Sequence, residues 1–299
     1  MQLVTSVVLG ALAGLLGSAL YAGSVVIYRS QAEEMSALVV SATKMFVALP
    51  FMAVLVLLGP GPTLLTFPVE TIIFLALSII LGAVVGDTLY LIAQERIGVS
   101  YAFPIAMSFP IITYFLAMLF LGEPFLLSRL AGVVISVAGV VTISRERQTS
   151  QRNQMKEFDA LGVGLALITA LLYAAGAVIL QVGVTDADPI STNFVRVLFG
   201  SVAFVPMLGA AFGRGMKRPT GRALKAVVVA GFFGMAIGSL LYVTSVKLAG
   251  ATITSVVGST APLFAVPISV FHLKEEVTKK TLLGVITTVL GVILVVMGF

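Results

Sequence analysis

The sequence predicts an all-α integral membrane protein with ten transmembrane helices in two inverted five-helix repeats. The first observation is composition: 59% of the residues are hydrophobic and 10% are charged, whereas soluble domains carry about one-quarter charged residues. The second is a succession of apolar runs of about 20 residues, the length that crosses a hydrocarbon core of about 30 Å as a helix. The third is a set of features that recurs after 152 residues.

Charged or Pro- and Gly-rich breaks divide the chain into apolar segments, each of which predicts one span. The predicted spans are 3–28, 36–58, 69–93, 99–121, 127–144, 159–182, 188–212, 222–247, 251–273 and 280–298. The first is too long for a signal-peptide core of about 7–15 residues, so we expect it to be retained. The most polar connection, 145–158, predicts a linker between a first repeat (1–144) and a second (159–299).

The two predicted repeats align without a gap at this offset of 152 residues. Lys44 matches Arg196, and matching Tyr, Pro and Glu pairs in one register are not expected from chance similarity between apolar helices. The further matches include Tyr21/Tyr173, Gly82/Gly234, Gly86/Gly238, Tyr90/Tyr242, Pro110/Pro262, Glu123/Glu275, Gly132/Gly284 and Gly139/Gly291. Because five crossings are an odd number, the second repeat must be inverted, an arrangement typical of secondary transporters.

Basic residues predict the orientation in the cell membrane. Fourteen of the eighteen Lys and Arg residues fall in the loops after the odd-numbered predicted spans, and only Arg129 and Lys247 fall on the other side. The positive-inside rule therefore predicts that the fourteen-residue side is cytoplasmic and that both termini are outside.

Composition also limits the chemistry. The chain has no Cys and a single His, His272, so a thiolate or His-rich metal site and Cys-based catalysis are excluded. No nucleotide-binding signature is present, and we expect no cofactor and no metal. The excess of basic residues, a formal net charge of +5, lies in membrane loops, which argues against a nucleic-acid partner. The expected partners are membrane lipid and a small-molecule substrate.

One ordered set of residues, present twice, carries a family resemblance. It comprises Tyr90, Gly98, Ser108, Pro110, Gly122, Glu123, Leu130, Gly132, Gly139 and Val140, and then Tyr242, Gly250, Thr260, Pro262, Glu275, Gly284, Gly291 and Val292. This set resembles the drug/metabolite transporter superfamily with tandem EamA-type repeats. The resemblance implies that spans three, four, eight and nine surround a substrate cavity, and it implies export or exchange of small metabolites, often amino acids. It also implies cytoplasmic termini, opposite to the charge count, and an arginine where this chain has Lys44.

Away from the ends of the predicted spans, the charged residues are two basic residues, Lys44 and Arg196, and one acidic residue, Asp87. Lys44 and Arg196 occupy equivalent positions, and an ionisable group in a span costs at least about 2.5 kcal/mol, so it should face a cavity or a partner. We expect them to attract an anionic substrate group; snorkelling, or pairing with helix carbonyls or Asp87, is the alternative. Asp87 is a candidate for coupling to a proton or counter-substrate, with a structural ion pair or hydrogen bond as its alternative.

Other recurring residues complete the candidate site. The tyrosines Tyr21, Tyr173, Tyr90 and Tyr242 are candidates for lining a substrate cavity, although tyrosine is also a common interfacial anchor. Ser108 and Thr260 are further substrate-binding candidates. Pro110 and Pro262, expected in mid-span, either hinge a gate or kink a helix for packing. The sequence thus favours a secondary transporter working by alternating access. A passive channel or facilitator and, less favoured, a membrane enzyme acting on lipid remain as alternatives.

Overall fold

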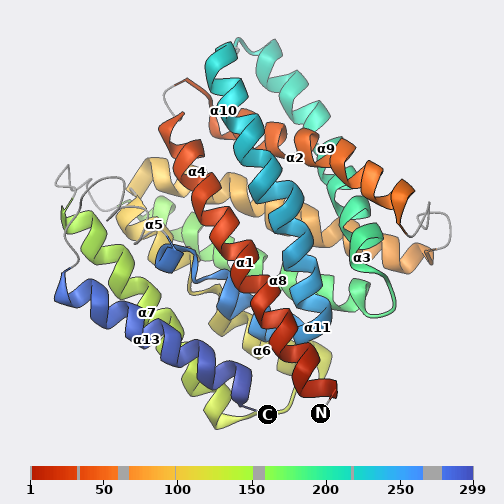
Figure 1. The fold of residues 1–299 in the computed structure, drawn as a ribbon. Helices are drawn as coiled ribbons and strands as arrows, with labels where there is room; N and C mark the ends of the chain where they lie inside the picture. The colour runs from red at the N-terminus through yellow and green to blue at the C-terminus, as the bar shows by residue number, and fades with distance from the viewer. Residues whose placement is uncertain are drawn as a thin grey trace.

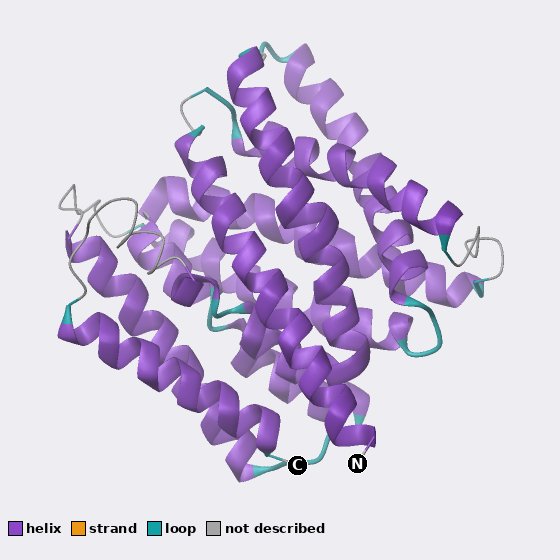
Figure 2. Ribbon diagram, viewed as in Figure 1, coloured by secondary structure: helices purple, strands orange, loops and turns teal. Residues whose placement is uncertain are grey.

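The computed structural model describes residues 2–31, 34–59, 67–97, 99–150, 159–216, 219–264 and 278–298. Within these residues every regular element is a helix (Figure 2), and the helices form one bundle (Figure 1). Large apolar side chains cover its outside: Leu58 is 81% exposed and Leu119 is 76% exposed. Such a surface suits contact with lipid, and the prediction of an all-α membrane protein is confirmed.

The first half of the chain forms α1 to α7. The helix bounds are α1 (Gln2–Ser30), α2 (Ala37–Leu58), α3 (Val69–Ile79), η2 (Ile80–Gly86), α4 (Asp87–Ile97), α5 (Val99–Ala106), α6 (Phe109–Leu121) and α7 (Leu127–Ser150). Helix α7 continues past the predicted end of the fifth span, so residues 145–150 of the predicted linker are helical. Arg, Glu and Gln in that stretch are good helix formers, which explains the extension. Residues 151–158 lie outside the described part of the chain.

The second half forms α8 to α13, and polar caps mark where several of its helices begin. The bounds are α8 (Ala160–Val184), α9 (Pro189–Gly213), α10 (Gly221–Gly231), η3 (Phe232–Ile237), α11 (Gly238–Gly258) and α13 (Lys279–Met297). The side chains of Asp159, Asp188, Thr220 and Thr278 each accept a backbone N–H of the helix that follows. These bonds satisfy donors that an uncapped helix would leave unpaired.

The described helices include part of each of the ten predicted spans. Eight stretches are long and apolar enough to cross a membrane, and Leu127–Ile143 is a shorter apolar helix. One of the eight, Gly221–Gly258, contains both the predicted span 222–247 and the start of the predicted span 251–273. Gly250 divides it with φ 85° and ψ 168°, a conformation that only glycine adopts readily.

Helix breaks interrupt the predicted fourth and ninth spans directly before the two mid-span prolines. A turn ending at Ser108 separates α5 from α6, and Pro110 lies in the first turn of α6. In the second half, a turn ending at Thr260 precedes the helical residues that contain Pro262. A first-turn proline removes an N–H that has no partner within the helix, so both prolines begin a new helix instead of kinking a continuous one.

The third and eighth spans contain π-helical segments that the sequence did not predict. Segment η2 separates α3 from α4, and segment η3 separates α10 from α11 at the equivalent place in the second half. A π-helical turn contains an additional residue and shifts the faces of the helix beyond it. Asp87 is the first residue after η2, so the shift occurs directly beside a candidate site residue.

Helices α7 and α13 show how the repeats are related. They are equivalent in the two repeats and lie side by side (Figure 1). Gly132 packs against Gly291, and Gly139 packs against Gly284, so the helices run in opposite directions. At the 152-residue offset each of these contacts is the image of the other. This is the contact expected about a two-fold axis in the membrane plane, and it confirms the inverted repeats.

The same relation holds for α1 and α8, the first helices of the repeats. Gly10 of α1 packs against Ala249 of α11, and its equivalent Gly162 in α8 packs against Ile97 of α4. Each first helix therefore packs on the third span of the other repeat. The repeats interlock along these contacts, and the candidate site residues lie where they meet.

Candidate functional site

The lysine and the aspartate inside the spans form an ion pair. Lys44 Nζ of α2 donates a hydrogen bond to Asp87 Oδ2 of α4, and the two side chains are 7% and 14% exposed. Tyr173 of α8 donates its hydroxyl to Asp87 Oδ1 at 2.7 Å. The carboxylate thus binds groups from both repeats. Of the alternatives left open by the sequence, the pair with Asp87 describes Lys44 in this structure.

Two glycines make room for this arrangement. A Cβ atom on Gly86 would lie 3.0 Å from Tyr173 Cε1, so the ring reaches Asp87 only because the preceding residue has no side chain. A Cβ atom on Gly231 would lie 3.0 Å from Lys44 Cα. Close backbone approach at small residues is the usual way in which membrane helices pack.

Tyr21 of α1 and Tyr90 of α4 extend the group around Asp87. The Tyr21 hydroxyl lies near enough to Asp87 and Tyr90 to interact electrostatically with both. Its side chain is 36% exposed, whereas Tyr90 is 9% exposed and packs edge-on against Phe103. We call Lys44, Asp87, Tyr173, Tyr21 and Tyr90 the lysine cluster.

Arg196 of α9 is surrounded by neutral groups. Its Nε donates to Ser78 Oγ at 3.0 Å and its Nη1 donates to Asn193 Oδ1 at 3.4 Å. Ser239 Oγ donates to the same amide oxygen at 2.8 Å. The guanidinium carbon lies 6.0 Å from the centre of the Tyr242 ring, a separation at which a cation is attracted to an aromatic face. We call Arg196, Asn193, Ser239, Ser78 and Tyr242 the arginine cluster.

The two clusters occupy equivalent places but differ in charge. Ser239 in the second repeat stands where Asp87 stands in the first. Arg196 is 6% exposed, and among the described residues no Asp or Glu forms an ion pair with it. One cation inside the spans is therefore neutralised by Asp87, and the other contacts only neutral partners within the described part of the chain.

Ser108 and Thr260 serve the helix breaks in this structure. Ser108 Oγ donates to the Ile105 carbonyl at 2.6 Å, and Thr260 Oγ1 donates to the Val257 carbonyl at 2.6 Å. Within the described residues neither hydroxyl bonds to a member of the two clusters. The break beside Ser108 still touches the lysine cluster, because Phe109 packs edge-on against Tyr173 with ring centres 5.7 Å apart.

Sequence reasoning missed Asn193 and Ser78 as partners of Arg196. Asn193 carried a usable signal, since an amide inside an apolar span three residues before an arginine shares its helix face. Ser78 carried no such signal, because serine is common in membrane helices and Ser78 lies in the other repeat from Arg196.

A second polar contact between the repeats lies at the Gly250 break. Glu123 Oε2 accepts hydrogen bonds from Arg129 Nη1 at 3.2 Å and from Thr252 Oγ1 at 2.9 Å. The Gln181 side chain accepts the backbone N–H of Ala251 beside the same break. Gly98 and Glu275, the equivalents of Gly250 and Glu123 in the repeats, lie outside the described residues. For metal binding, the described part of the chain contains no group of three or more His, Cys, Asp or Glu residues.

Comparison with known proteins gives family matches in both halves. The sequence profile of the EamA-like transporter family matches residues 8–145 and again 160–297. An "uncharacterized transporter" of Archaeoglobus fulgidus is 24% identical over 229 residues, 76% of this chain and 77% of that protein. The "uncharacterized inner membrane transporter YhbE" of Escherichia coli K12 is 27% identical over 144 residues, 47% of this chain and 44% of that protein.

A solved crystal structure is similar over nearly the whole chain. Its TM-score is 0.78 at 16% sequence identity, with 97% of this chain and 96% of that chain covered. At this identity the similarity concerns the fold alone. It extends over both repeats, since 97% of this chain is covered.

Proposed function

We propose that this chain, which belongs to the EamA-like transporter family, carries a small anionic metabolite across the membrane by alternating access. Family membership makes the chain a membrane transporter. The substrate class, the mechanism and the roles of individual residues are our proposal. The expected substrates carry a carboxylate or phosphate group, as amino acids and organic acids do.

The observation that carries the proposal is the uncompensated charge of Arg196. A guanidinium that is 6% exposed and has no carboxylate partner among the described residues is costly to keep inside a membrane protein. An anionic substrate group would supply the missing charge, and the planar guanidinium suits bidentate binding of carboxylate or phosphate. The Tyr242 face and the Asn193 amide already hold the guanidinium in place.

The lysine cluster is proposed as the coupling element. Asp87 neutralises Lys44 in this structure, so a proton taken up by the Asp87 carboxylate, or a charged counter-substrate, would release Lys44 to bind an anion. The tyrosines of the cluster would then provide hydroxyl groups and ring faces to the remainder of the substrate. Tyr242 would do so from the arginine cluster.

Alternating access is proposed from the symmetry of the bundle. Two halves related by a two-fold axis in the membrane plane can exchange conformations and open to opposite sides. The helix breaks at Pro110 and Pro262 and the Gly250 break are the proposed gating positions, because the helix is interrupted there and side chains bond to backbone groups beside each break. Export or exchange is the direction that the family resemblance implies.

The test is counterflow in proteoliposomes containing the purified full-length chain. Vesicles are preloaded with unlabelled amino acids, organic acids, sugar phosphates or neutral nucleosides, and uptake of the labelled compound is measured. We expect accelerated uptake for at least one anionic compound, because exchange on a carrier is faster than net movement. Arg196→Gln should lower that uptake roughly 30-fold or more, the usual consequence of removing a buried charge that pairs with a partner.

Arg96→Gln is the matched control, since it removes an arginine whose side chain is 44% exposed. If preloading never accelerated uptake, the chain would be a channel or facilitator and not a carrier. If Arg196→Gln transported anions as fast as the Arg96→Gln control, the anion-binding role of Arg196 would be wrong.

A further inference from the structure

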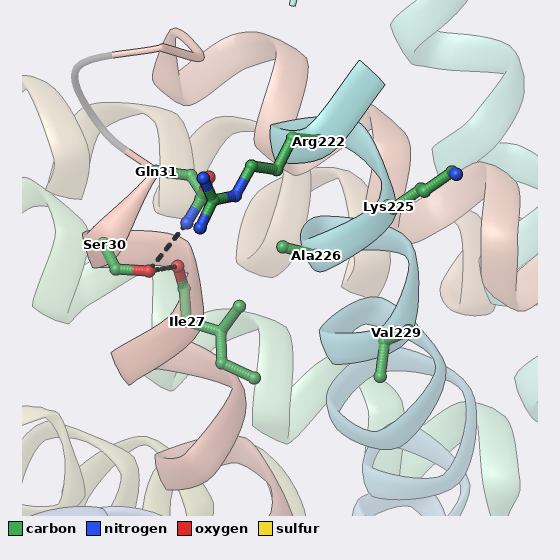
Figure 3. A pocket seen from close by; sticks show the side chains of 7 residues that line it. All are labelled: Ile27, Ser30, Gln31, Arg222, Lys225, Ala226 and Val229. Carbon is green, nitrogen blue, oxygen red and sulfur yellow. Dashed lines mark hydrogen bonds between the residues drawn. The ribbon is translucent and has the colours of Figure 1, made fainter. Parts of the chain in front are cut away.

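A groove between the end of α1 and the beginning of α10 opens on the surface of the bundle (Figure 3). Its volume is about 510 Å³, and none of its lining residues belongs to the lysine cluster or the arginine cluster. Seven residues line it: Ile27, Ser30, Gln31, Arg222, Lys225, Ala226 and Val229. Two of these side chains are positively charged at neutral pH and none is acidic, so the groove favours an anionic occupant.

The lining is divided into a polar level and an apolar level. Ser30, Gln31, Arg222 and Lys225 lie at the helix ends, where Gln31 Nε2 donates to Ser30 Oγ at 2.9 Å (Figure 3). Val229 lies four residues further along α10 than Lys225, about 6 Å deeper at 1.5 Å per residue. Ile27 and Ala226 line this deeper level with it.

The groove faces the lipid side of the bundle. Val229 is 54% exposed, and Phe233, four residues further along the same span, is 46% exposed. On the opposite face of α10, Ala223 and Val227 are completely buried against the bundle. The basic residues at the helix end therefore lie next to an apolar strip along the same helix. A phospholipid has the same order, with a charged headgroup followed by an acyl chain.

From this arrangement we propose that the groove between α1 and α10 is a binding site for one anionic phospholipid. Arg222, whose side chain reaches across the groove toward Gln31 (Figure 3), binds the phosphate, and the Lys225 ammonium, which points away from α1, adds attraction for the anionic headgroup. Gln31 offers an amide N–H at the same level, whereas Ser30 Oγ already donates to the Ile27 carbonyl. The first part of an acyl chain lies along Ile27 and Val229. The groove is on the side of the chain with the excess of basic loops, which is the predicted cytoplasmic side. A zwitterionic lipid lacks the net charge that the two cations attract.

The chain offers a clean reporter, because it contains no Trp. In Val229→Trp the indole at the deeper level is the only tryptophan of the protein. We would reconstitute this variant in phosphatidylcholine vesicles, free of any other protein, that contain increasing amounts of phosphatidylglycerol brominated in its acyl chains. Brominated phosphatidylcholine in an otherwise identical series gives the quenching produced by bulk lipid. Phe233→Trp is a second reporter in case Val229→Trp does not fold.

Each cation near an anionic lipid surface contributes about a fivefold gain in binding. We therefore expect quenching to favour phosphatidylglycerol over phosphatidylcholine by roughly tenfold or more, and Arg222→Gln with Lys225→Gln to reduce this preference to within about threefold. Arg214→Gln with Lys279→Gln removes two exposed charges on the same predicted side and should preserve it. Equal quenching by the two lipids would overturn the proposal, as would equal loss in the control pair.

A last arm separates a lipid from a free anion. Inorganic phosphate and glycerol phosphate are added while sodium chloride keeps the ionic strength constant. Unchanged quenching supports a bound phospholipid. Displacement by millimolar phosphate would instead assign the cations to a soluble anion and overturn the lipid proposal.

Discussion

The lysine cluster and the arginine cluster occupy equivalent positions and solve the same electrostatic problem differently. Lys44 is neutralised by Asp87, whereas Arg196 is surrounded by Ser78, Asn193 and the Tyr242 ring. The helices that carry them are related by the inversion seen at α7 and α13. A symmetric scaffold therefore holds an asymmetric pair of charges, and the proposed roles differ accordingly: Arg196 would bind an anion directly, whereas Lys44 would first have to be released from Asp87.

The largest expected effect comes from leaving a charge of the lysine cluster unpaired. Asp87→Asn or Lys44→Gln should each lower the free energy of unfolding by about 3 kcal/mol, because one buried charge loses its partner. The double variant should recover at least half of that loss. Arg196→Gln breaks no ion pair seen in the described ranges of the chain and should cost much less. Chemical unfolding in detergent micelles measures all four variants; equal losses for Lys44→Gln and Arg196→Gln would remove the contrast between the clusters.

Making the second cluster resemble the first is the next test. Ser239 and Arg196 both bond to the Asn193 amide oxygen. Ser239→Asp therefore places a carboxylate close to Arg196, at the position equivalent to Asp87, and should neutralise the guanidinium. Counterflow of an anionic substrate should fall roughly 30-fold, in the range for buried charge pairs. Ser239→Asn, which adds similar volume without charge, should retain most of the activity. Undiminished transport by the aspartate variant would show that the charge of Arg196 is not used.

The symmetric scaffold should respond equally in both halves. A Cβ atom would meet the facing helix at 2.4 Å on Gly139 and at 2.3 Å on Gly291. Each Gly→Ala substitution should therefore cost about 2 kcal/mol from overpacking, with similar values for the two. Gly164→Ala in α8 is the control, because no atom lies within 4 Å of its Cβ position. A loss at only one of the two glycines would show that the halves do not share this interface equally.

The smallest effect concerns the exposed ion pair that joins the repeats outside the membrane. A hydrogen bond from the Arg96 guanidinium, aided by backbone N–H groups of α8, lowers the pKa of the Asp159 carboxyl. A lowered folded-state pKa stabilises the protein above the unfolded pKa of about 3.9, and this stabilisation is lost as pH falls through the folded value. The melting temperature of Asp159→Asn should thus lie slightly below that of the unmodified chain at pH 6. The difference should shrink as the pH falls below about 3.9, because the carboxyl becomes protonated first in the unfolded chain and then in the folded one.

The sequence alone determined the membrane location, the ten segments and the inverted repeat. The length of the apolar runs and the repeated register can both be read directly from the sequence. Because each repeat crosses the membrane five times, an odd number, the second repeat must be inverted. It also located Lys44, Asp87 and Arg196, because a charge inside an apolar run is visible without coordinates.

Only the tertiary structure decided which cation is neutralised. The Lys44–Asp87 pair, the Ser78 contact to Arg196 and the Tyr173 contact to Asp87 join residues that are 43, 118 and 86 positions apart. Contacts between residues so far apart in the sequence depend on how the helices pack, and the spacing along the chain does not encode that packing. The π-helical segments were likewise visible only in the tertiary structure, because no residue pattern in these apolar runs distinguishes a π-helical turn from a continuous α-helix.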